Sequence, residues 1–259
     1  MSLTNKTPSE TYKDLLTIDN SNNGVDSTSR TIKTGNGTAT STNISDRSLQ
    51  IRSNTDNTAA FSVRDSGGST RLIVDTTNGT VKAMGHHLNT QYKTFGIYDF
   101  SPAAGYHYPL ISNNMMFSDS GDDFIATNDF GNGTDPATSW DASGGTPKIV
   151  VACMWQIPDN IYIDSAKIFI TADADSAYEV HINSYDISIG IGHEGDLSNG
   201  TTHATFSGST QATSAKIRIG ALTIGTPAIS ADKVVLAFIE NVTGTGDLTA
   251  SIQLKYHLV

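Results

Sequence analysis

The chain has 259 residues, a formal net charge of −10 and only 16% charged residues. This length allows one ordinary domain and a smaller module, and the acidic balance argues against nucleic-acid binding, which needs clustered Lys and Arg. No run of about twenty apolar residues is present, so we expect no membrane insertion.

The charge and the aromatic residues divide the chain into two regions. Up to Thr80 there are eight Lys or Arg and eight Asp or Glu, so the charge of −10 belongs to the remainder. Tyr12 and Phe61 are the aromatic residues of the first part, against eighteen later. Ser, Thr, Asn, Asp and Gly are abundant, and this favours strands and tight turns over helices. We therefore predict an all-β chain with two regions of different character.

Residues 1–45 hold few apolar side chains, scattered among polar residues, with turn signals at Asn23-Gly24 and Gly35-Asn36-Gly37. Such a segment cannot offset its ordering entropy alone. We therefore predict that it docks on other subunits.

Residues 46–84 alternate short apolar pairs with Gly-containing turns such as Asp65-Ser66-Gly67-Gly68 and Asp75-Thr76-Thr77-Asn78-Gly79. The pattern predicts strands of three to five residues. Each strand has too little to bury to be stable in one chain. We predict a short intertwined β shaft of three chains, and the alternative is a small extension folded on the main domain. The expected core of this trimeric stem is Leu49, Ile51, Phe61, Val63, Leu72 and Val74.

Residues 85–259 are predicted to form the distal domain. Its first part, to about residue 147, is rich in aromatic residues and turns, as loops on a β scaffold that carry contacts often are. From Lys148 onward we expect at least six strands, including the apolar runs 149–157 and 233–240 and the alternating segment 252–258. An antiparallel β-sandwich, jelly-roll-like, is the predicted arrangement. The residues predicted for surface contact are Tyr106, Tyr108 and Trp140.

The residues that could carry chemistry do not form a recognisable signature. Cys153 lies in an apolar run and is expected to be a buried, inert side chain. Asp119, Asp122 and Asp123 could bind Ca²⁺, but an incomplete ligand set favours a solvated loop. His86-His87 could hold a metal only on a threefold axis, because adjacent strand residues point to opposite faces. We therefore assign no metal and no cofactor.

Enzymatic activity has no motif in its favour. The chain lacks a Gly-x-Ser-x-Gly elbow, and Gly190-Ile191-Gly192 lacks the context and third glycine of a dinucleotide site. Its twenty-six acidic residues make a glycosidase pair impossible to assign from sequence. We expect that the protein is not an enzyme.

Two stretches resemble structural proteins of tailed phages. The opening from Lys6-Thr7-Pro8 to Leu16, followed by Asp19 to Asp26, resembles the start of virion fibre and decoration proteins, particularly of marine, short-tailed phages. Ala60-Phe61-Ser62-Val63-Arg64-Asp65 with Leu72 to Gly79 is similar to β-rich shaft repeats of trimeric fibres and tailspikes. The resemblance implies a homotrimer in the virion, N-terminal attachment to the particle and an outward-facing distal domain.

Three hypotheses follow from the residues and the resemblance together. The first is a homotrimeric tail-fibre-like appendage: residues 1–45 dock on tail or capsid proteins, 46–84 form the stem, and 85–259 meet a glycan or protein of the host surface for attachment. The second is a capsid decoration or cement protein. The third is a glycan-degrading tailspike-type enzyme, which would need a cleft with two carboxylates.

Overall fold

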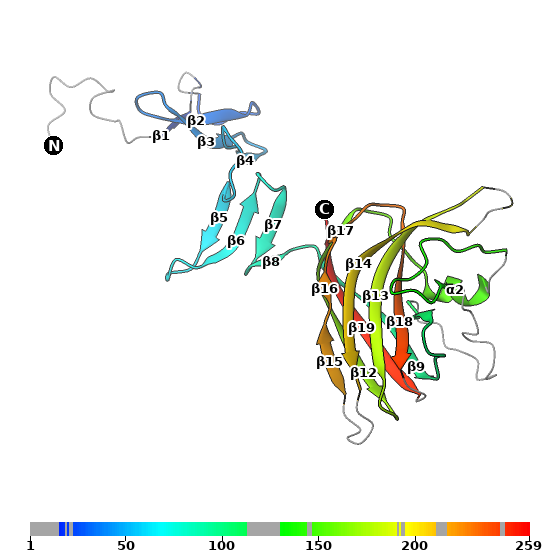
Figure 1. Cartoon of the computed structure of the whole chain (residues 1–259). Coiled ribbons are helices and arrows are strands. Elements are labelled where there is room, and N and C mark those ends of the chain that lie inside the picture. The colour runs from blue at the N-terminus through cyan, green and yellow to red at the C-terminus, as the bar shows by residue number, and fades with distance from the viewer. Residues whose placement is uncertain are drawn as a thin grey trace, which may run out of the picture. The chain divides into compact units, whose positions relative to one another are not determined.

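The computed structural model describes residues 16–18, 20, 23–112, 130–143, 147–190, 192, 195–210, 217–243 and 247–259. Two compact units make up the chain, Met1–Leu88 and Asn89–Val259. Every strand pair in the described residues is antiparallel, and the described helix is a single short one, α2 (Pro147–Cys153). The prediction of an all-β, antiparallel chain is therefore confirmed (Figure 1).

The first unit contains two small sheets, each formed by four strands that pair in chain order. The first sheet contains β1 (Leu16–Ile18), β2 (Arg30–Thr34), β3 (Ala39–Ile44) and β4 (Leu49–Ile51). The second contains β5 (Phe61–Arg64), β6 (Thr70–Asp75), β7 (Thr80–Ala83) and β8 (His86–His87).

Aspartates and glycines close the hairpins of the second sheet, as the sequence predicted. Asp65 Oδ1 accepts hydrogen bonds from the backbone N of Gly67 (3.0 Å) and of Ser69 (2.8 Å). Gly68 and Gly79 have φ of +84° and +65°, values that side chains with a Cβ rarely adopt. The turns therefore set the register of β5, β6 and β7 through local chemistry.

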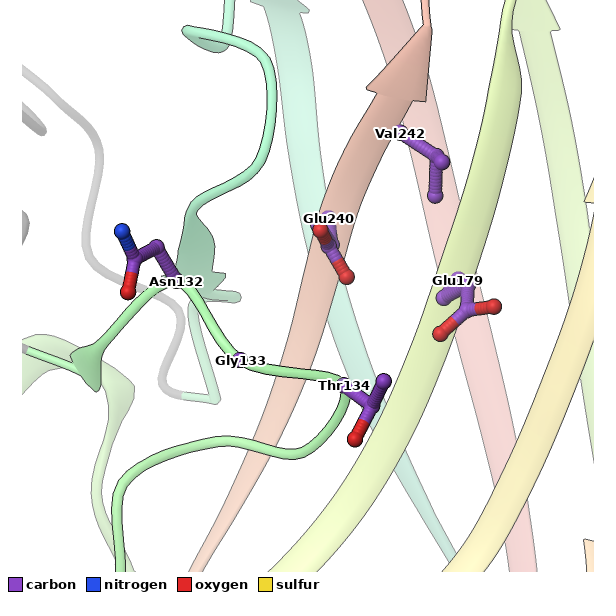
Figure 2. Close-up of a pocket in the computed structure, with 6 residues that line it drawn as sticks. All are labelled: Asn132, Gly133, Thr134, Glu179, Glu240 and Val242. Atoms are coloured by element: carbon purple, nitrogen blue, oxygen red, sulfur yellow. The ribbon is translucent and has the colours of Figure 1, made fainter.

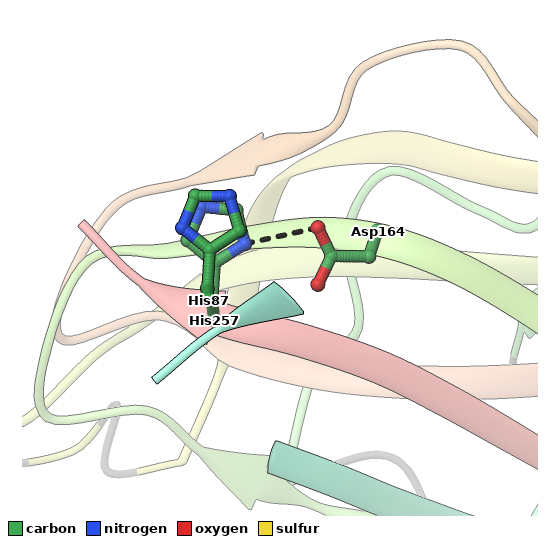
Figure 3. A group of neighbouring side chains, drawn as sticks. All are labelled: His87, Asp164 and His257. Atoms are coloured by element: carbon green, nitrogen blue, oxygen red, sulfur yellow. Dashed lines mark hydrogen bonds and ion pairs between the residues drawn. The ribbon is translucent and has the colours of Figure 1, made fainter. Parts of the chain in front are cut away.

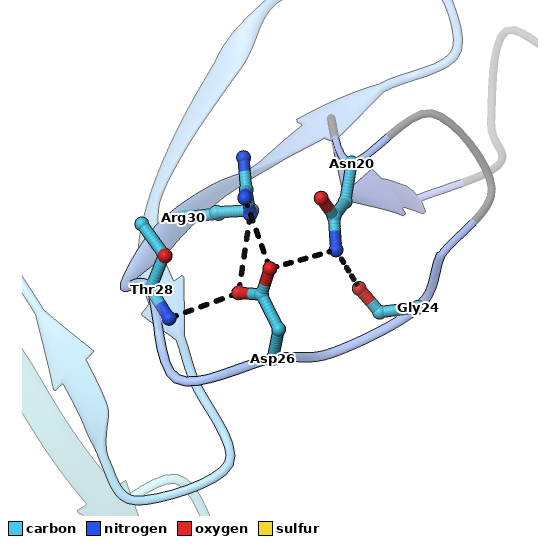
Figure 4. A network of polar contacts seen from close by, with 5 residues as sticks. All are labelled: Asn20, Gly24, Asp26, Thr28 and Arg30. Carbon is cyan, nitrogen blue, oxygen red and sulfur yellow. Dashed lines mark hydrogen bonds and ion pairs between the residues drawn. The ribbon is translucent and has the colours of Figure 1, made fainter.

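A polar network organises the loop between β1 and β2 (Figure 4). The Asp26 carboxylate accepts hydrogen bonds from Arg30 Nη2 at 3.0 Å and from the backbone N of Thr28 at 2.9 Å. Asn20 Nδ2 donates to the same carboxylate and to the carbonyl oxygen of Gly24. These bonds, that from Arg30 above all, lower the pKa of Asp26. The loop is therefore held by side chains in place of an apolar core.

The second unit contains two larger sheets whose strands curl into a half-barrel (Figure 1). One sheet has the order β15 (Arg218–Ala221), β12 (Ile161–Ala172), β19 (Leu248–Leu258), β9 (Thr90–Phe100), with β17 (Ala228–Ile229) also on β12. The other has the order β10 (His107–Pro109), β18 (Val234–Thr243), β13 (Ala177–Ile187), β14 (Leu197–Ser209), β16 (Thr223–Ile224), with β11 (Trp155–Gln156) on β18.

The inner faces of these two sheets share one hydrophobic core. Phe95 of β9 and Ile168 of β12 belong to the same buried cluster as Val180 of β13. Strand β18 is covered on both faces, as its continuous apolar run predicted: Val235, Ala237 and Ile239 enter this core, whereas alternate residues enter a second one. That second core lies on the outer face of the sheet, under α2 and residues 130–143, and its buried members are Phe130, Trp140, Val150, Cys153, Tyr185, Leu197, Val234, Leu236 and Phe238.

A β-bulge changes the inward-facing positions of β12. Ile161 and Ile163 are buried before the bulge, and Ala166 and Ile168 are buried after it, so the alternation moves by one residue. The pairing with β19 shifts between Ile163 and Ser165. The bulge directs Asp164 toward His257, whose Nδ1 lies 3.0 Å from Asp164 Oδ1 (Figure 3).

The apolar run 149–157, predicted to be one strand, is a helix followed by the two-residue strand β11. This prediction was wrong because short apolar runs do not distinguish the two structures by periodicity. Pro147 stands at the first helical position, where its missing N–H has no cost. Val150 and Cys153, three residues apart, are fully buried while Val151 is exposed, which is the spacing of a helix.

The sequence predicts boundaries after residues 45 and 84, and the chain divides into two compact units. The division after Leu88 lies four residues beyond the predicted end of the stem at residue 84. The predicted boundary after residue 45 falls inside the first sheet, between the paired strands β3 and β4. Among the described residues, no helix is both long and apolar enough to cross a membrane.

Candidate functional site

A group of buried polar side chains occupies the outer face of the larger unit's second sheet. It is built by three adjacent strands, β10, β18 and β13, in which His107 pairs with Glu240 and Glu240 pairs with Glu179. His181 lies two residues beyond Glu179 and therefore on the same face. Their neighbours along the strands, including Tyr108 and Ile239, point into the inner core. The polar group therefore lies on the same outer face of the sheet as the second hydrophobic core.

The hydrogen bonds of His107 determine which of its ring nitrogens is free. Its Nδ1 lies 3.4 Å from the carbonyl oxygen of Gly131, which also accepts the backbone N–H of His107 at 3.2 Å. Because a carbonyl oxygen only accepts, Nδ1 carries the proton and Nε2 keeps its lone pair. That Nε2 lies 3.4 Å from Glu240 Oε2 and has no hydrogen-bond partner in the described residues.

His181 has two unpartnered ring nitrogens in the same place. Its ring lies edge-on to that of His107, with centroids 5.0 Å apart. Nδ1 is 3.7 Å from Asp135 Oδ1 and Nε2 is 3.8 Å from Glu179 Oε2. Both separations exceed hydrogen-bond length, and neither nitrogen has a hydrogen-bond partner among the described residues. His107 is 0% exposed and His181 is 3% exposed, so water does not replace the missing partners freely.

Burial shifts the pKa values of these side chains toward their neutral forms. It lowers the pKa of His181 to about 4, with a smaller contribution from His107, while Asp135 and Glu179 act in the opposite direction. Burial also lowers the pKa of His107. The pKa of Glu240 is raised, first by burial and then by the charge of Glu179. The site therefore presents neutral imidazoles, the form that binds metal ions.

An open hollow of about 320 Å³ gives access to this group (Figure 2). Glu240 and Glu179 line it from β18 and β13, and residues 132–134 pass across its other side. His107, His181 and Glu240 each bring one donor atom within 4.8 Å of the others. These three residues together could hold a metal ion. Sequence reasoning missed them because they lie on separate strands and share no local spacing.

The second candidate site is an apolar face of the second small sheet. Pairing places Phe61 opposite Val74 and Val63 opposite Leu72, so all four project from one face. β7 extends this face, since Val81 pairs with Val74 and Ala83 with Leu72. Every member is either half-buried or exposed, and those most exposed are Val63 and Val81. The structure thus brings four of the six predicted stem residues together.

The remaining stem residues, Leu49 and Ile51, lie in β4 of the first sheet, and both are exposed. Val81 and Ala83 were not named from the sequence, although the alternation Val81-Lys82-Ala83 indicates the same face. We call the face formed by Phe61, Val63, Leu72, Val74, Val81 and Ala83 the stem face.

Two of the three residues predicted for surface contact are buried. Tyr108 is 3% exposed and belongs to the inner core, and Trp140 is 5% exposed and stacks on Phe130. Tyr106 is half-buried. The prediction was wrong for Tyr108 because strand β10 was read as a loop. It was wrong for Trp140 because residues 130–143 pack on a second core.

The aromatic side chains that do reach the surface of this unit include Tyr92 and Tyr98 of β9. Phe95 and Ile97 of the same strand are buried, so the period-two pattern could have separated the two sets. The predicted acidic cluster Asp119, Asp122 and Asp123 lies outside the described residues.

A scan against protein-family models finds no match, and a search of curated proteins finds none either.

Proposed function

We propose that this chain is a structural protein of a virus particle, the subunit of a homotrimeric, fibre-like appendage of a tailed phage. Residues 1–45 attach it to tail or capsid proteins, residues 46–84 form the stem, and the distal unit faces the host surface. In this role the protein is not an enzyme, and it acts by assembling into the appendage. The resemblance of the opening segment and of residues 60–79 to phage fibre proteins supplies the class of particle.

One observation carries the proposal: the described residues of the first unit form sheets without a hydrophobic core. Its described residues form two four-stranded sheets, yet none of their apolar side chains is buried, and the first buried hydrophobic residue among the described residues is Phe95. The residues of the first unit that are buried are polar, Asn20 and Ser45. Its exposed apolar side chains are Leu16, Val25, Leu49, Ile51, Val63, Val81, Met84 and Leu88.

Copies of the same chain are the partners that best account for this surface. A sheet gains little stability from an apolar face that stays open to water, because the stabilisation comes from removing that face from water against another surface. Three copies around one axis would bring three stem faces together, burying residues such as Val63 and Val81 at about 25 cal/mol per Å². A closed symmetric assembly satisfies every copy equally and leaves no face open.

The strand orders of the second unit support a jelly roll. The sheet β9, β19, β12, β15 and the sheet β10, β18, β13, β14 alternate in the chain as two four-stranded Greek-key sheets do. Jelly rolls occur in viral capsid and lectin domains. This analogy concerns fold alone, but it is consistent with an outward-facing module that meets glycans or proteins of a host.

The oligomeric state of the purified chain tests the proposal. Light scattering coupled to size-exclusion chromatography should give three times the chain mass of 27.5 kDa. Val63→Asp places a charge on the stem face and should dissociate the trimer. Ser62→Asp is the matched control, because Ser62 is the neighbouring exposed residue on the opposite face of β5. A wild-type chain that is a stable, folded monomer would overturn the proposal.

Attachment to the particle is tested separately. Deleting residues 1–52 removes the whole first sheet, β1 to β4, without cutting between paired strands. We expect the truncated chain to remain trimeric and to be absent from assembled particles. Electron cryomicroscopy of intact particles then distinguishes a fibre from a capsid decoration protein by where the N-terminal segment is mounted.

The tailspike-type hydrolase has one observation in its favour. Glu179 and Glu240 lie opposite each other and line the hollow of Figure 2, as a glycosidase pair must. The other lining residues, Asn132, Gly133, Thr134 and Val242, include no aromatic platform for a sugar ring. Release of reducing ends from host glycans by the wild type, lost in Glu179→Gln, would establish the hydrolase over the structural role.

A further inference from the structure

We propose that His107, His181 and Glu240 form a binding site for a divalent transition-metal ion of the zinc type. The site lies within the distal unit and does not depend on the trimer. An ion there would join the edge strand β10 to β18 and β13, and it would also fix residues 130–143 above them. The ion would therefore brace three strands and the segment above them on the outer face of the sheet.

The ligand geometry fits a tetrahedral ion. Zinc binds imidazole nitrogen and carboxylate oxygen at about 2.0–2.2 Å, so two ligand atoms of a tetrahedron lie roughly 3.3–3.5 Å apart. His107 Nε2 and Glu240 Oε2 are 3.4 Å apart. A donor of His181 lies within 4.8 Å of both, so the His181 ring would have to move toward them for all three to bind one ion. Two His and one Glu are a known zinc ligand set that leaves a fourth position open.

The unpartnered nitrogens are the second, independent observation. A buried polar atom without a hydrogen bond is energetically unfavourable, and this cluster contains three such atoms, His107 Nε2 and both ring nitrogens of His181. A metal ion supplies the missing partner for two of them at once. Among the described residues, no other side-chain donor reaches these nitrogens.

The surroundings of the site complete the requirements for a metal centre. His107 donates its Nδ1 proton to the carbonyl oxygen of Gly131, and this is the outer hydrogen bond that orients metal-binding imidazoles. Glu179 and Asp135 place two further carboxylates within 3.8 Å of His181, so the charge of a divalent ion is balanced. The hollow lined by Glu179 and Glu240 gives an ion access from solvent.

The nature of the donors selects the ion. Imidazole suits zinc and its neighbours in the transition series, whereas magnesium and calcium require oxygen ligands, six to eight of them for calcium. We therefore expect zinc and cobalt to bind and magnesium to have no effect. Cobalt is a useful probe, because its visible absorption reports a tetrahedral site.

The test uses the full-length chain, freed of metal with a chelator and titrated with Zn²⁺ by calorimetry. One ion per chain should bind to the wild type. His107→Gln, His181→Gln and Glu240→Gln should each weaken binding by about a hundred-fold or more, beyond the effect of losing an outer-sphere partner. His203→Gln is the matched control, a buried histidine of the same sheet whose two nitrogens already have partners. His86→Gln with His87→Gln controls for the adjacent pair in β8.

Thermal unfolding keeps the test decisive where a variant folds poorly. Excess Zn²⁺ should raise the Tm of the wild type, by mass action on the folded state, and Mg²⁺ should not. Glu240→Gln keeps the shape of the side chain and should fold, yet it should lose most of that shift. The proposal is overturned if all three ligand variants bind zinc with the affinity of the wild type. It is also overturned if zinc leaves the Tm of the wild type unaltered.

Discussion

Gly200 and Thr138 are in direct backbone contact, the Gly200 N–H donating to the Thr138 carbonyl oxygen at 2.8 Å. The approach leaves no room for a side chain on Gly200. An added Cβ would lie 2.8 Å from Thr138 Cα and 2.7 Å from Cε1 of the fully buried Tyr185. Tyr185 in turn donates its hydroxyl hydrogen to the carbonyl oxygen of Ala137 at 3.0 Å. Residues 130–143, which cover the outer core, are therefore fastened to β14 and β13 at this point.

Substitution Gly200→Ala should lower the free energy of unfolding by about 1–3 kcal/mol, the usual cost of forcing extra volume into a packed region. The backbone of Thr138 cannot move without breaking the contact that holds the loop. Urea unfolding followed by tryptophan fluorescence measures the change. Gly225→Ala is the control, because a methyl there meets nothing within 4 Å. Equal stability of the two variants would contradict the close approach.

His203 should make the protein less stable in mild acid. Its Nδ1 donates to the carbonyl oxygen of Thr226 at 2.6 Å, and its Nε2, 2.8 Å from Ser184 Oγ, accepts the hydroxyl hydrogen. Burial lowers the pKa of His203 below the ordinary 6.5, and the charge of Lys233 acts in the same direction. Folding therefore favours the neutral ring, so stability is complete above about pH 6.5 and falls as the pH drops toward the lower, folded pKa.

Urea unfolding of the wild type and of His203→Gln, at pH values from about 8 to about 5, measures this contribution. The glutamine cannot titrate, so the loss of stability on acidification should be smaller than in the wild type. It should not vanish, because burial also lowers the pKa of His107 and His181. Chelator is present throughout to exclude metal ions. Parallel curves for the two proteins would show that His203 does not contribute.

Much of the strand structure follows from local patterns in the sequence. The alternation of Tyr178, Val180 and Ile182 corresponds to β13, and the closing segment from Ile252 corresponds to β19. These patterns persist because each strand buries one face, and that requirement acts over a few residues. The apolar run 149–157 was wrongly predicted as one strand, because a buried helix and a buried strand can both produce such a run.

The histidine and glutamate site depends on which strands become neighbours in the sheet. No local pattern in the sequence specifies that order. His107, His181 and Glu240 meet only because β18 lies between β10 and β13. The stem face is the opposite case. Phe61 and Val74 lie in successive strands joined by tight turns, so their pairing was accessible from the spacing of the turns.

Cys153 should be unreactive while the protein is folded. Its side chain is fully buried, and its Sγ lies 3.5 Å from the carbonyl oxygen of Pro109. Burial raises the pKa of the thiol to about 12, so almost none is thiolate, the nucleophilic form, near neutral pH. An aromatic disulfide reagent should therefore label the native chain only at the rate of unfolding. The same reagent in denaturant should release one equivalent at once, and equally fast labelling of the native protein would refute the buried position.

Asp26 should control the order of the loop that follows β1. The variant Asp26→Asn keeps the shape of the side chain but removes the negative charge that binds Arg30. The hydrogen bond from Arg30 is the main cause of the lowered Asp26 pKa. The weaker acceptor of the variant should loosen the bond from the Thr28 amide, so that this amide exchanges hydrogen faster. Hydrogen exchange on the full-length chain measures the difference. Asp46→Asn is the control, because Asp46 meets Arg47 only at 3.8 Å. Unchanged protection of Thr28 in Asp26→Asn would mean that the strands alone hold the loop.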